Sequence, residues 1–324
     1  MTAPPDALPL IDCNPDRGSF RDDVLNGLQQ SPKDIPSKYL YDRRGSQLFD
    51  EICTLDAYYP TRTERAIMQT HGSAMTDAVG AGVQLVEYGS GSSLKTRELL
   101  DRLDGPAQYV PVDISKEHLL EAAAAIAEDY PHIPVRPVCA DYTAPFPLPE
   151  APAAQRTVVY FPGSTIGNFL PAEAQAFLEH IAAVIAPSGG LLVGVDLRKD
   201  PAVLRRAYND PEGVTAAFNK NLLRRINREL EGTFALDQFR HDAPWIADKS
   251  RIEMHLVSTM AQTATVAGQS FSFAEGEVIR TEYSHKYTLD AFAQRAQRAG
   301  LAVRDVWTDA RDWFSVQYLT PVSS

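Results

Sequence analysis

A run of small residues between an apolar and a polar stretch is the first feature of this sequence that could bind a ligand. Gly89-Ser90-Gly91 follows the apolar run 83–88, and Lys95 lies in the segment that comes next. Glycines let a backbone approach a ligand closely, and a helix that starts here would favour negative groups at its N-terminus. A strand, a glycine turn and a helix in this order are typical of sites for nucleotide-containing ligands.

Three kinds of ligand site use such a turn. Gly89 to Thr96 nearly matches the phosphate-binding pattern GxxxxGK[ST], but Leu94 stands where its second glycine should be, and a β-carbon there would obstruct the phosphate. The dinucleotide pattern GxGxxG would need a glycine at Leu94 too. The third pattern is an acid, one spacer and GxG, which begins here at Glu87. It is typical of S-adenosylmethionine turns, because a carboxylate attracts an amino group and a sulfonium but repels a pyrophosphate.

Two further acids follow the next two predicted strands. Asp113 ends one strand and Asp141 follows another, so three acids come after three successive strands. Ligands of open α/β sheets bind at this carboxyl edge, where Asp113 could accept ribose hydroxyls and Asp141 the adenine amino group. A single Asp is more often a helix N-cap or a solvated loop residue. Three acids around one glycine turn nevertheless favour a cofactor site.

Alternating β-rich and helical segments predict the scaffold that positions these residues. Strands are expected at 83–88, 109–112, 135–139, 157–161 and 191–195, with helices at 94–103, 116–129 and 171–185. Ser115 is the expected N-cap of the second helix. This alternation predicts a parallel, doubly wound sheet with right-handed crossovers.

The pattern changes after residue 197. Helices are expected at 201–208 and 214–230, then strands at 251–266, 270–273 and 278–287, a helix capped by Thr288, and strands at 302–307 and 314–318. We therefore predict an α/β protein. Its parts are a Rossmann-like seven-stranded sheet with an antiparallel last strand, and a second, discontinuous α+β lobe. Residues 61–196 plus 287–324 would bind S-adenosylmethionine, and residues 1–60 plus 197–286 would form the substrate lobe.

Composition narrows the classes of function. The chain has 324 residues, with 31 Lys and Arg against 42 Asp and Glu, so its net charge is −11. Nucleic acids and anionic membranes both require a basic face, and no apolar run approaches the ~20 residues that span a bilayer. The three cysteines are far apart, with no CxxC pair and no His at metal-ligand spacing. We expect a cytoplasmic monomer without a metal, a nucleic-acid partner or a membrane partner.

Several further segments resemble one family, the histidine N-alpha-methyltransferases of ergothioneine biosynthesis. The matching segments are YLYD at 39–42, GSQLFD at 45–50, YYPTRTE at 58–64, EYGSGSSLKT at 87–96, FPGSTIGN at 161–168, AY at 207–208, GVTAAFN at 213–219, RIEM at 251–254 and TEYS at 281–284. The resemblance runs from about residue 20 to the C-terminus, and it implies a seven-stranded methyltransferase sheet of Rossmann type with a substrate lobe, in agreement with the two parts predicted above. Tyr88, Pro162 and His285 depart from the family pattern.

The resemblance implies that the chain trimethylates the α-amino group of L-histidine to hercynine, with S-adenosylmethionine as the methyl donor. Carried over by position, Asn168 and Tyr208 would hold the substrate carboxylate, Tyr58, Glu282 and Ser284 would surround the imidazole, and Tyr41, Phe49, Gly163 and Met254 would shape the pocket around the amine and the ring. The cofactor residues would be Glu87, Gly89, Ser90, Gly91, Lys95, Asp113 and Asp141.

Methyl transfer from a sulfonium is an in-line displacement, so positioning can supply much of the rate, and neither a metal nor a covalent nucleophile is required. The attacking amine must be neutral. Its proton could pass to the Tyr41 phenol, the Gly163 carbonyl or water. Aromatic faces can hold the growing cation between methylations. Glu282 fits an imidazole because a carboxylate accepts its N–H, whereas an apolar ring would leave that carboxylate unpaired.

Three other functions stay open at the level of sequence. A related branch of the family methylates the amine of a prenylated tryptophan, although Glu282 and Met254 favour a small polar ring. A catalytically silent protein that senses the cofactor would keep the glycine turn. An NTPase would use the near-match to a phosphate-binding loop that ends at Thr96.

Overall fold

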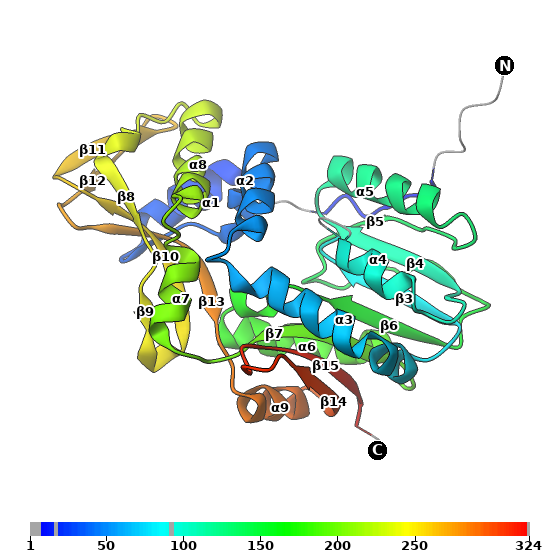
Figure 1. Cartoon of the computed structure of the whole chain (residues 1–324). Coiled ribbons are helices and arrows are strands. Elements are labelled where there is room, and N and C mark those ends of the chain that lie inside the picture. Colours follow the sequence, from blue (N-terminus) through cyan, green and yellow to red (C-terminus); the bar gives the residue numbers. More distant parts are fainter. Residues whose placement is uncertain (1–7, 16–18, 91–93, 323–324) are drawn as a thin grey trace.

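Within the residues that the structure describes, the chain forms two large parts, each a β-sheet with its own helices, and a separate two-stranded hairpin (Figure 1). The computed structural model describes residues 8–15, 19–90 and 94–322. Within these ranges no helix is long and apolar enough to span a bilayer. The expected α/β fold is confirmed.

The large sheet has eight strands within the described residues, in the order β1-β5-β4-β3-β6-β7-β15-β14. Their bounds are Ile11–Asp12 (β1), Val83–Tyr88 (β3), Gln108–Asp113 (β4), Val138–Cys139 (β5), Arg156–Phe161 (β6), Gly190–Asp196 (β7), Leu301–Thr308 (β14) and Phe314–Pro321 (β15). Neighbouring strands from β1 to β7 are parallel, and β15 is antiparallel to both β7 and β14. The antiparallel last strand is thus as predicted.

Helices cover both faces of the large sheet, which explains why its central strands are continuous apolar runs. One face packs against α3 (Tyr59–Val79), α4 (Leu94–Leu100) and α5 (Lys116–Asp129). The other face packs against α6 (Pro171–Ile185) and α9 (Leu289–Arg298). Along β6, Val158 and Tyr160 face the first layer while Val159 and Phe161 face the second, as the two-residue period of a strand requires.

The predicted boundaries change at three places. The sheet gains an eighth strand because β1 pairs in parallel with β5, although residues 1–60 had been assigned to the other lobe. The expected boundary at residue 60 falls inside α3, whose Ile67, Met68 and Met75 are buried against the large sheet. Strand β5 is shorter than predicted, because neighbouring prolines lack the N–H that a sheet ladder needs.

The small sheet has the order β2-β13-β10-β8, with β9 also paired to β10. Its strands are Lys33–Asp34 (β2), Phe239–Asp242 (β8), Trp245–Ile246 (β9), Arg251–Ser258 (β10) and Val278–His285 (β13). The helices around it are Phe20–Gln29 (α1), Arg43–Thr54 (α2), Pro201–Tyr208 (α7) and Val214–Glu229 (α8), with short 3₁₀ turns Ser37–Leu40 (η1), Leu236–Gln238 (η3) and Ala247–Lys249 (η4). Their buried side chains form a separate apolar cluster.

The strand predicted at 251–266 is wrong as a single element. The structure divides it into β10 and β11 (Gln262–Val266), and β11 pairs with β12 (Gln269–Phe273) as a separate hairpin. The chain turns after Ser258, whose hydroxyl donates to the Met260 carbonyl at 2.8 Å. Alternating apolar residues run through both strands, so periodicity gives no signal of the turn.

The order of the large sheet reverses between β3 and β6, because successive crossovers lead in opposite directions from there. Open α/β sheets bind ligands at the carboxyl ends of the strands at such a switch point. Gly89 and Ser90 follow β3, and Gly163 follows β6 just before the 3₁₀ turn Thr165–Asn168 (η2). The topology therefore brings the predicted glycine turn and the FPGSTIGN segment to one edge.

Helix capping provides a test of the fold. Thr288 and Ser115 are the N-cap residues of α9 and α5, as predicted, but only the Thr288 hydroxyl makes a capping hydrogen bond, which it accepts from the Ala291 N–H at 3.1 Å. We expect Thr288→Ala to lower the free energy of unfolding by about 1 kcal/mol, since an N-cap is lost. The matched variant Ser115→Ala should change it by less than about 0.5 kcal/mol. Urea unfolding measures both, and equal losses would contradict this assignment of the caps.

Candidate active site

Two backbone turns at the switch point depend on glycine. Gly89 has φ +75° and Gly163 has φ +79°, in the left-handed region that side chains disfavour. Ser90 is buried, and its hydroxyl has no hydrogen-bond partner among the described residues. The predicted cofactor residue Gly91 lies outside the described residues. A buried hydroxyl without a partner beside a tight glycine turn leaves a polar group for a ligand to satisfy.

Glu87 lies inside the protein rather than on its surface. Its carboxylate accepts hydrogen bonds from the hydroxyls of Thr96, at 2.8 Å, and Tyr109. Burial raises the pKa of Glu87, and these two hydrogen bonds oppose the rise. The acid predicted to face the cofactor therefore joins β3, α4 and β4 beneath the glycine turn.

Asp113 and Asp141 lie at the carboxyl ends of neighbouring strands, as predicted. Asp113 is the last residue of β4 and accepts the Ser115 N–H at 2.8 Å. Asp141 follows β5 and accepts the backbone N–H and the hydroxyl of Thr143 at 2.9 and 2.6 Å. Both residues are partly exposed. Carboxylates here suit a ligand that carries hydroxyl and amino donors, so the residues present fit the ribose, adenine and amino groups of S-adenosylmethionine.

Three predicted substrate residues meet at Glu282 on β13. The Asn168 amide donates to Glu282 Oε1 at 3.3 Å, and the Tyr41 hydroxyl lies 3.5 Å from the same oxygen. Asn168 comes from η2, Tyr41 from the end of η1 and Glu282 from the small sheet. Three segments that are far apart in the sequence thus converge, and Glu282 is buried among them.

A second polar pair lies two residues along β13. The hydroxyls of Tyr208 and Ser284 are 2.7 Å apart, and both side chains are buried. Residues that are two apart in a strand face the same side, so Glu282 and Ser284 share one face. The residues assigned by resemblance to the carboxylate and to the imidazole are therefore interleaved: Asn168 contacts Glu282, and Tyr208 contacts Ser284.

Aromatic rings lie in a chain around these polar groups. Tyr41 packs on Phe49 with ring centroids 5.5 Å apart, Phe49 on Tyr58 at 6.3 Å, and Tyr58 on Tyr208 at 5.9 Å, each edge to face. Tyr41 is 38% exposed, so its ring is available to a ligand. Electron-rich rings grouped in this way can hold a cationic ammonium group.

The predicted pocket residue Met254 and the unusual residue His285 both contribute differently from the other site residues. Met254 lies opposite Glu282 across the β10–β13 pair, but it is 2% exposed and belongs to the apolar cluster of the small sheet. His285, which departs from the family pattern, lies three residues after Glu282 in β13 and so faces the opposite side of the strand. Its Nδ1 donates to the Gly167 carbonyl at 2.9 Å and so anchors η2.

The sequence reading gave no role to Glu64, although it ends the YYPTRTE segment. Glu64 is buried in α3, accepts the Gly163 N–H at 2.9 Å and pairs with the Lys95 ammonium at 2.6 Å. A β-carbon on Gly194 would lie 2.2 Å from Glu64 Oε1, so this glycine makes room for the carboxylate. Glu64 fixes two predicted site residues at once. The sequence signal for this role is a charged residue within the buried face of an amphipathic helix.

Lys95 is consequently not the free lysine that a phosphate-binding loop requires. Its ammonium pairs with the buried carboxylate of Glu64, and its side chain is only 17% exposed. This pairing disfavours the NTPase alternative.

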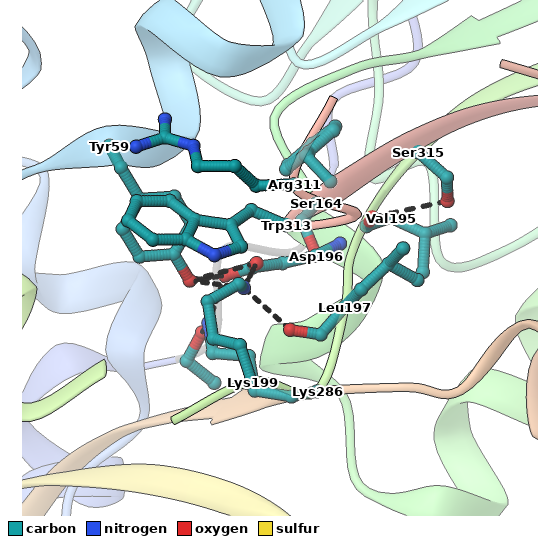
Figure 2. Close-up of polar contacts among 12 residues, drawn as sticks. Tyr59, Ser164, Val195, Asp196, Leu197, Lys199, Lys286, Arg311, Trp313 and Ser315 are labelled. Atoms are coloured by element: carbon teal, nitrogen blue, oxygen red, sulfur yellow. Dashed lines mark hydrogen bonds and ion pairs between the residues drawn. The ribbon is translucent and has the colours of Figure 1, made fainter. Parts of the chain in front are cut away.

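A cluster of buried charges next to the substrate residues was also missed (Figure 2). The Asp196 carboxylate, at the end of β7, accepts hydrogen bonds from Tyr59, Lys199 and Lys286. Burial would raise the pKa of Asp196, but the two lysines lower it below its usual value. Burial lowers the pKa of Lys199 to about 8. Lys286 keeps a raised pKa despite burial because of Asp196. Three charges separated by up to 90 positions in sequence give no local signal.

The surroundings of Tyr41 and Glu282 shift the pKa of both groups. Although part of the Tyr41 ring is exposed, its hydroxyl group is buried, which raises its pKa well above the usual value, and the nearby Glu282 adds to the rise. Tyr41 therefore stays a neutral phenol at neutral pH and can accept a hydrogen bond but does not act as a phenolate base. Burial also raises the pKa of Glu282, to about 7, although Lys286 and Tyr41 oppose it.

Similarity to known proteins bears on the function of this site. Residues 20–321 match the family model described as "Histidine-specific methyltransferase, SAM-dependent". A histidine N-alpha-methyltransferase from Mycolicibacterium smegmatis is 44% identical over 90% of this chain and 91% of its own length, and one from Mycobacterium tuberculosis is 42% identical over the same shares. Ergothioneine biosynthesis protein 1 from Neurospora crassa is 30% identical over 88% of this chain and 33% of its own length.

The role of Glu64 can be tested by substitution. We expect Glu64→Ala to lower the free energy of unfolding by about 3 kcal/mol, because it leaves the Lys95 ammonium and the Gly163 N–H without their acceptor. Glu98→Ala is the matched control, since it breaks the more exposed pair with Arg65 and should cost less than about 1 kcal/mol. Urea unfolding of both variants gives the comparison. Equal losses in the free energy of unfolding would show that Glu64 stabilises the fold no more than the partly exposed Glu98 does.

The raised pKa of Glu282 predicts a pH-dependent stability. The unfolded carboxyl titrates near 4.5 and the folded one near 7, so the folded state holds an extra proton between these values. The free energy of unfolding is therefore highest below about pH 4.5, and it falls by about 3 kcal/mol as the pH rises through about 7. Glu282→Gln cannot titrate and should lack this loss. Urea unfolding between about pH 5 and 8 measures the difference, which should be absent for the exposed control Glu212→Gln. A difference between wild type and Glu282→Gln that is independent of pH would contradict the assignment.

Proposed function

Because this chain belongs to the family of histidine-specific, S-adenosylmethionine-dependent methyltransferases, we propose that it methylates the α-amino group of L-histidine. Three successive transfers would give hercynine, the trimethylated product from which ergothioneine biosynthesis proceeds. The observation that carries the proposal is the convergence of Asn168, Tyr41 and Glu282 beside a chain of aromatic rings.

The donor supplies an electrophilic methyl group on a sulfonium when it is bound. Asp113 and Asp141 would hold its ribose and adenine at the carboxyl edge of β4 and β5. Gly89 and Ser90 would let its amino acid portion lie close to the backbone. Glu87 would support the glycine turn from the protein interior, because its carboxylate already accepts hydrogen bonds from Thr96 and Tyr109.

The substrate residues divide by chemistry. The Glu282 carboxylate would accept an imidazole N–H, and the amide of Asn168, which contacts it in the free protein, would turn to the substrate carboxylate together with Tyr208. Rings of Tyr41, Phe49 and Tyr58 would face the amine as it becomes a quaternary ammonium.

The neutral amine needs positioning more than it needs a strong base. The Tyr41 oxygen would accept a hydrogen bond from the amine, and the carbonyl of Gly163 would lie on the other side of the same group. Glu64 holds the Gly163 N–H and so restricts where this carbonyl can lie. Alignment of the amine with the methyl group is then the main contribution of the protein to the rate.

A prenylated tryptophan is the second candidate substrate, and two features disfavour it. The two relatives with 44% and 42% identity act on histidine according to their names. An indole also carries its single N–H on a larger, bicyclic ring, whereas the buried Glu282 carboxylate favours a small polar ring.

Mass spectrometry of reaction mixtures tests the proposal. The purified chain, S-adenosylmethionine and L-histidine should yield mass gains of one to three methyl groups on histidine, with little or none on dimethylallyltryptophan or tryptophan. We expect Glu282→Ala to reduce kcat/KM for histidine at least about a hundredfold, because a buried partner of the ring is lost. Its affinity for S-adenosylhomocysteine, measured by calorimetry, should stay within about twofold of wild type.

Two results would contradict the proposal. Methylation of dimethylallyltryptophan but not histidine would assign the chain to the other branch of the family. Binding of S-adenosylhomocysteine without methylation of any tested amine would favour the cofactor sensor. Unchanged histidine turnover in Glu282→Ala would leave the reaction intact but remove the role of this carboxylate in specificity.

A further inference from the structure

Lys286 is buried directly behind two of the residues proposed to bind substrate. Its ammonium nitrogen lies 2.6 Å from Asp196 Oδ2, 2.9 Å from the Tyr208 hydroxyl and 2.7 Å from the Ser284 hydroxyl. Its side chain is 1% exposed, as is that of Asp196. Lys286 lies just beyond the TEYS segment at 281–284.

The number of N–H and O–H donors around Lys286 determines which groups donate and which accept. An ammonium group has three N–H donors and no acceptor, and Lys286 has three acceptors within reach. Tyr208 and Ser284 therefore both accept from Lys286, and each has one O–H hydrogen to place elsewhere. The 2.7 Å contact between the two hydroxyls uses one of these hydrogens. One O–H remains available to a group outside the network.

The charges around Lys286 favour an anion as that group. Asp196 is shared between Lys286 and Lys199, and two further carboxylates interact with these lysines, Glu282 with Lys286 and Asp309 with Lys199. Lys199 directs its remaining contacts to the Tyr59 hydroxyl and the Leu197 carbonyl, away from Tyr208 and Ser284. Interactions with a buried ammonium are strong because solvent does not screen them. An anionic group that accepts the free O–H would benefit from the ammonium of Lys286, which lies directly behind both hydroxyls.

We propose that Lys286 is a positioning residue for the substrate carboxylate. It holds the Tyr208–Ser284 pair in the arrangement in which Ser284 donates to Tyr208 and Tyr208 donates its phenolic O–H to the carboxylate. A phenol is the stronger donor of the two, which favours this order. The inference rests on the proposed function, because it takes an α-amino acid as the substrate.

A matched pair of variants isolates this role. Lys286→Met and Lys199→Met each remove one buried ammonium from the same carboxylate, and in each variant Asp196 keeps the other lysine and Tyr59 as partners. Neither variant leaves Asp196 without a cation, so both should fold. They differ in that Lys286 contacts Tyr208 and Ser284, whereas Lys199 does not.

We expect Lys286→Met to raise KM for L-histidine by about tenfold to a hundredfold, since a charge-assisted hydrogen bond is weakened. The effect on kcat should be smaller. Lys199→Met should keep KM within about threefold of wild type. Both variants should bind S-adenosylhomocysteine like wild type, which shows that they are folded.

A substrate analogue without the carboxylate tests whether the Tyr208 hydroxyl donates to that carboxylate. L-Histidine and L-histidinol, which has an alcohol in place of the carboxylate, are titrated calorimetrically into each protein in the presence of S-adenosylhomocysteine. Wild type and Lys199→Met should prefer histidine over histidinol at least about tenfold, and this preference should fall to about threefold or less in Lys286→Met.

The outcomes separate the inference from the proposed function. Equal rises of KM in the two lysine variants, or an unchanged KM and an unchanged preference over histidinol in Lys286→Met, would overturn the inference while wild-type methylation of histidine upholds the function. Wild-type protein that binds S-adenosylhomocysteine but neither binds nor methylates histidine would contradict the proposed function, and the inference with it.

Discussion

The buried carboxylate of Asp196 is the interaction on which the arrangement of the site depends. It ends a central strand of the large sheet and meets Lys286 from the end of β13, Lys199 from the next segment and Tyr59 from the start of α3. Its backbone N–H donates to Ser164, which precedes η2. A carboxylate buried this deeply is tolerable only with such partners. The two sheets are thus joined where the substrate residues converge.

Two other buried acids act on the cofactor side in the same way. Glu87 connects β3 with α4 and β4, and Glu64 connects α3 with Lys95 and the turn at Gly163. Each accepts at least two hydrogen bonds, so each restrains the elements that donate them. Interior carboxylates therefore hold the turns at the switch point, whereas Asp113 and Asp141 are more exposed at the same edge of the sheet.

The substrate side combines charge and aromatic surface. A carboxylate on β13 suits a ring with an N–H, hydroxyls backed by an ammonium suit an anion, and a chain of rings suits a cation. An amino acid with a polar ring carries all three groups, and the trimethylated product keeps them. The same set of side chains can therefore hold the substrate and its successively methylated forms.

What the sequence determined by itself was local or repetitive. The bounds of α5, α6 and α7 follow from helical periodicity and N-terminal signals, and the buried strands β3, β6 and β7 follow from apolar runs between turn residues. The glycine turn and the acids after the strands predicted the cofactor edge, because the carboxyl ends of parallel strands must lie together. The family resemblance selected Tyr41, Asn168 and Glu282, and the structure brings them together.

Only the tertiary structure decided which partners the buried charges have. The pairing of β1 with β5, the end of β10, and the contacts of Glu64 and Lys286 all join segments far apart in the chain or depend on where a turn falls. Sequence patterns report which residues avoid water, since that depends on side-chain type and period. They do not report which buried acid meets which buried base, because that depends on how the two sheets approach each other.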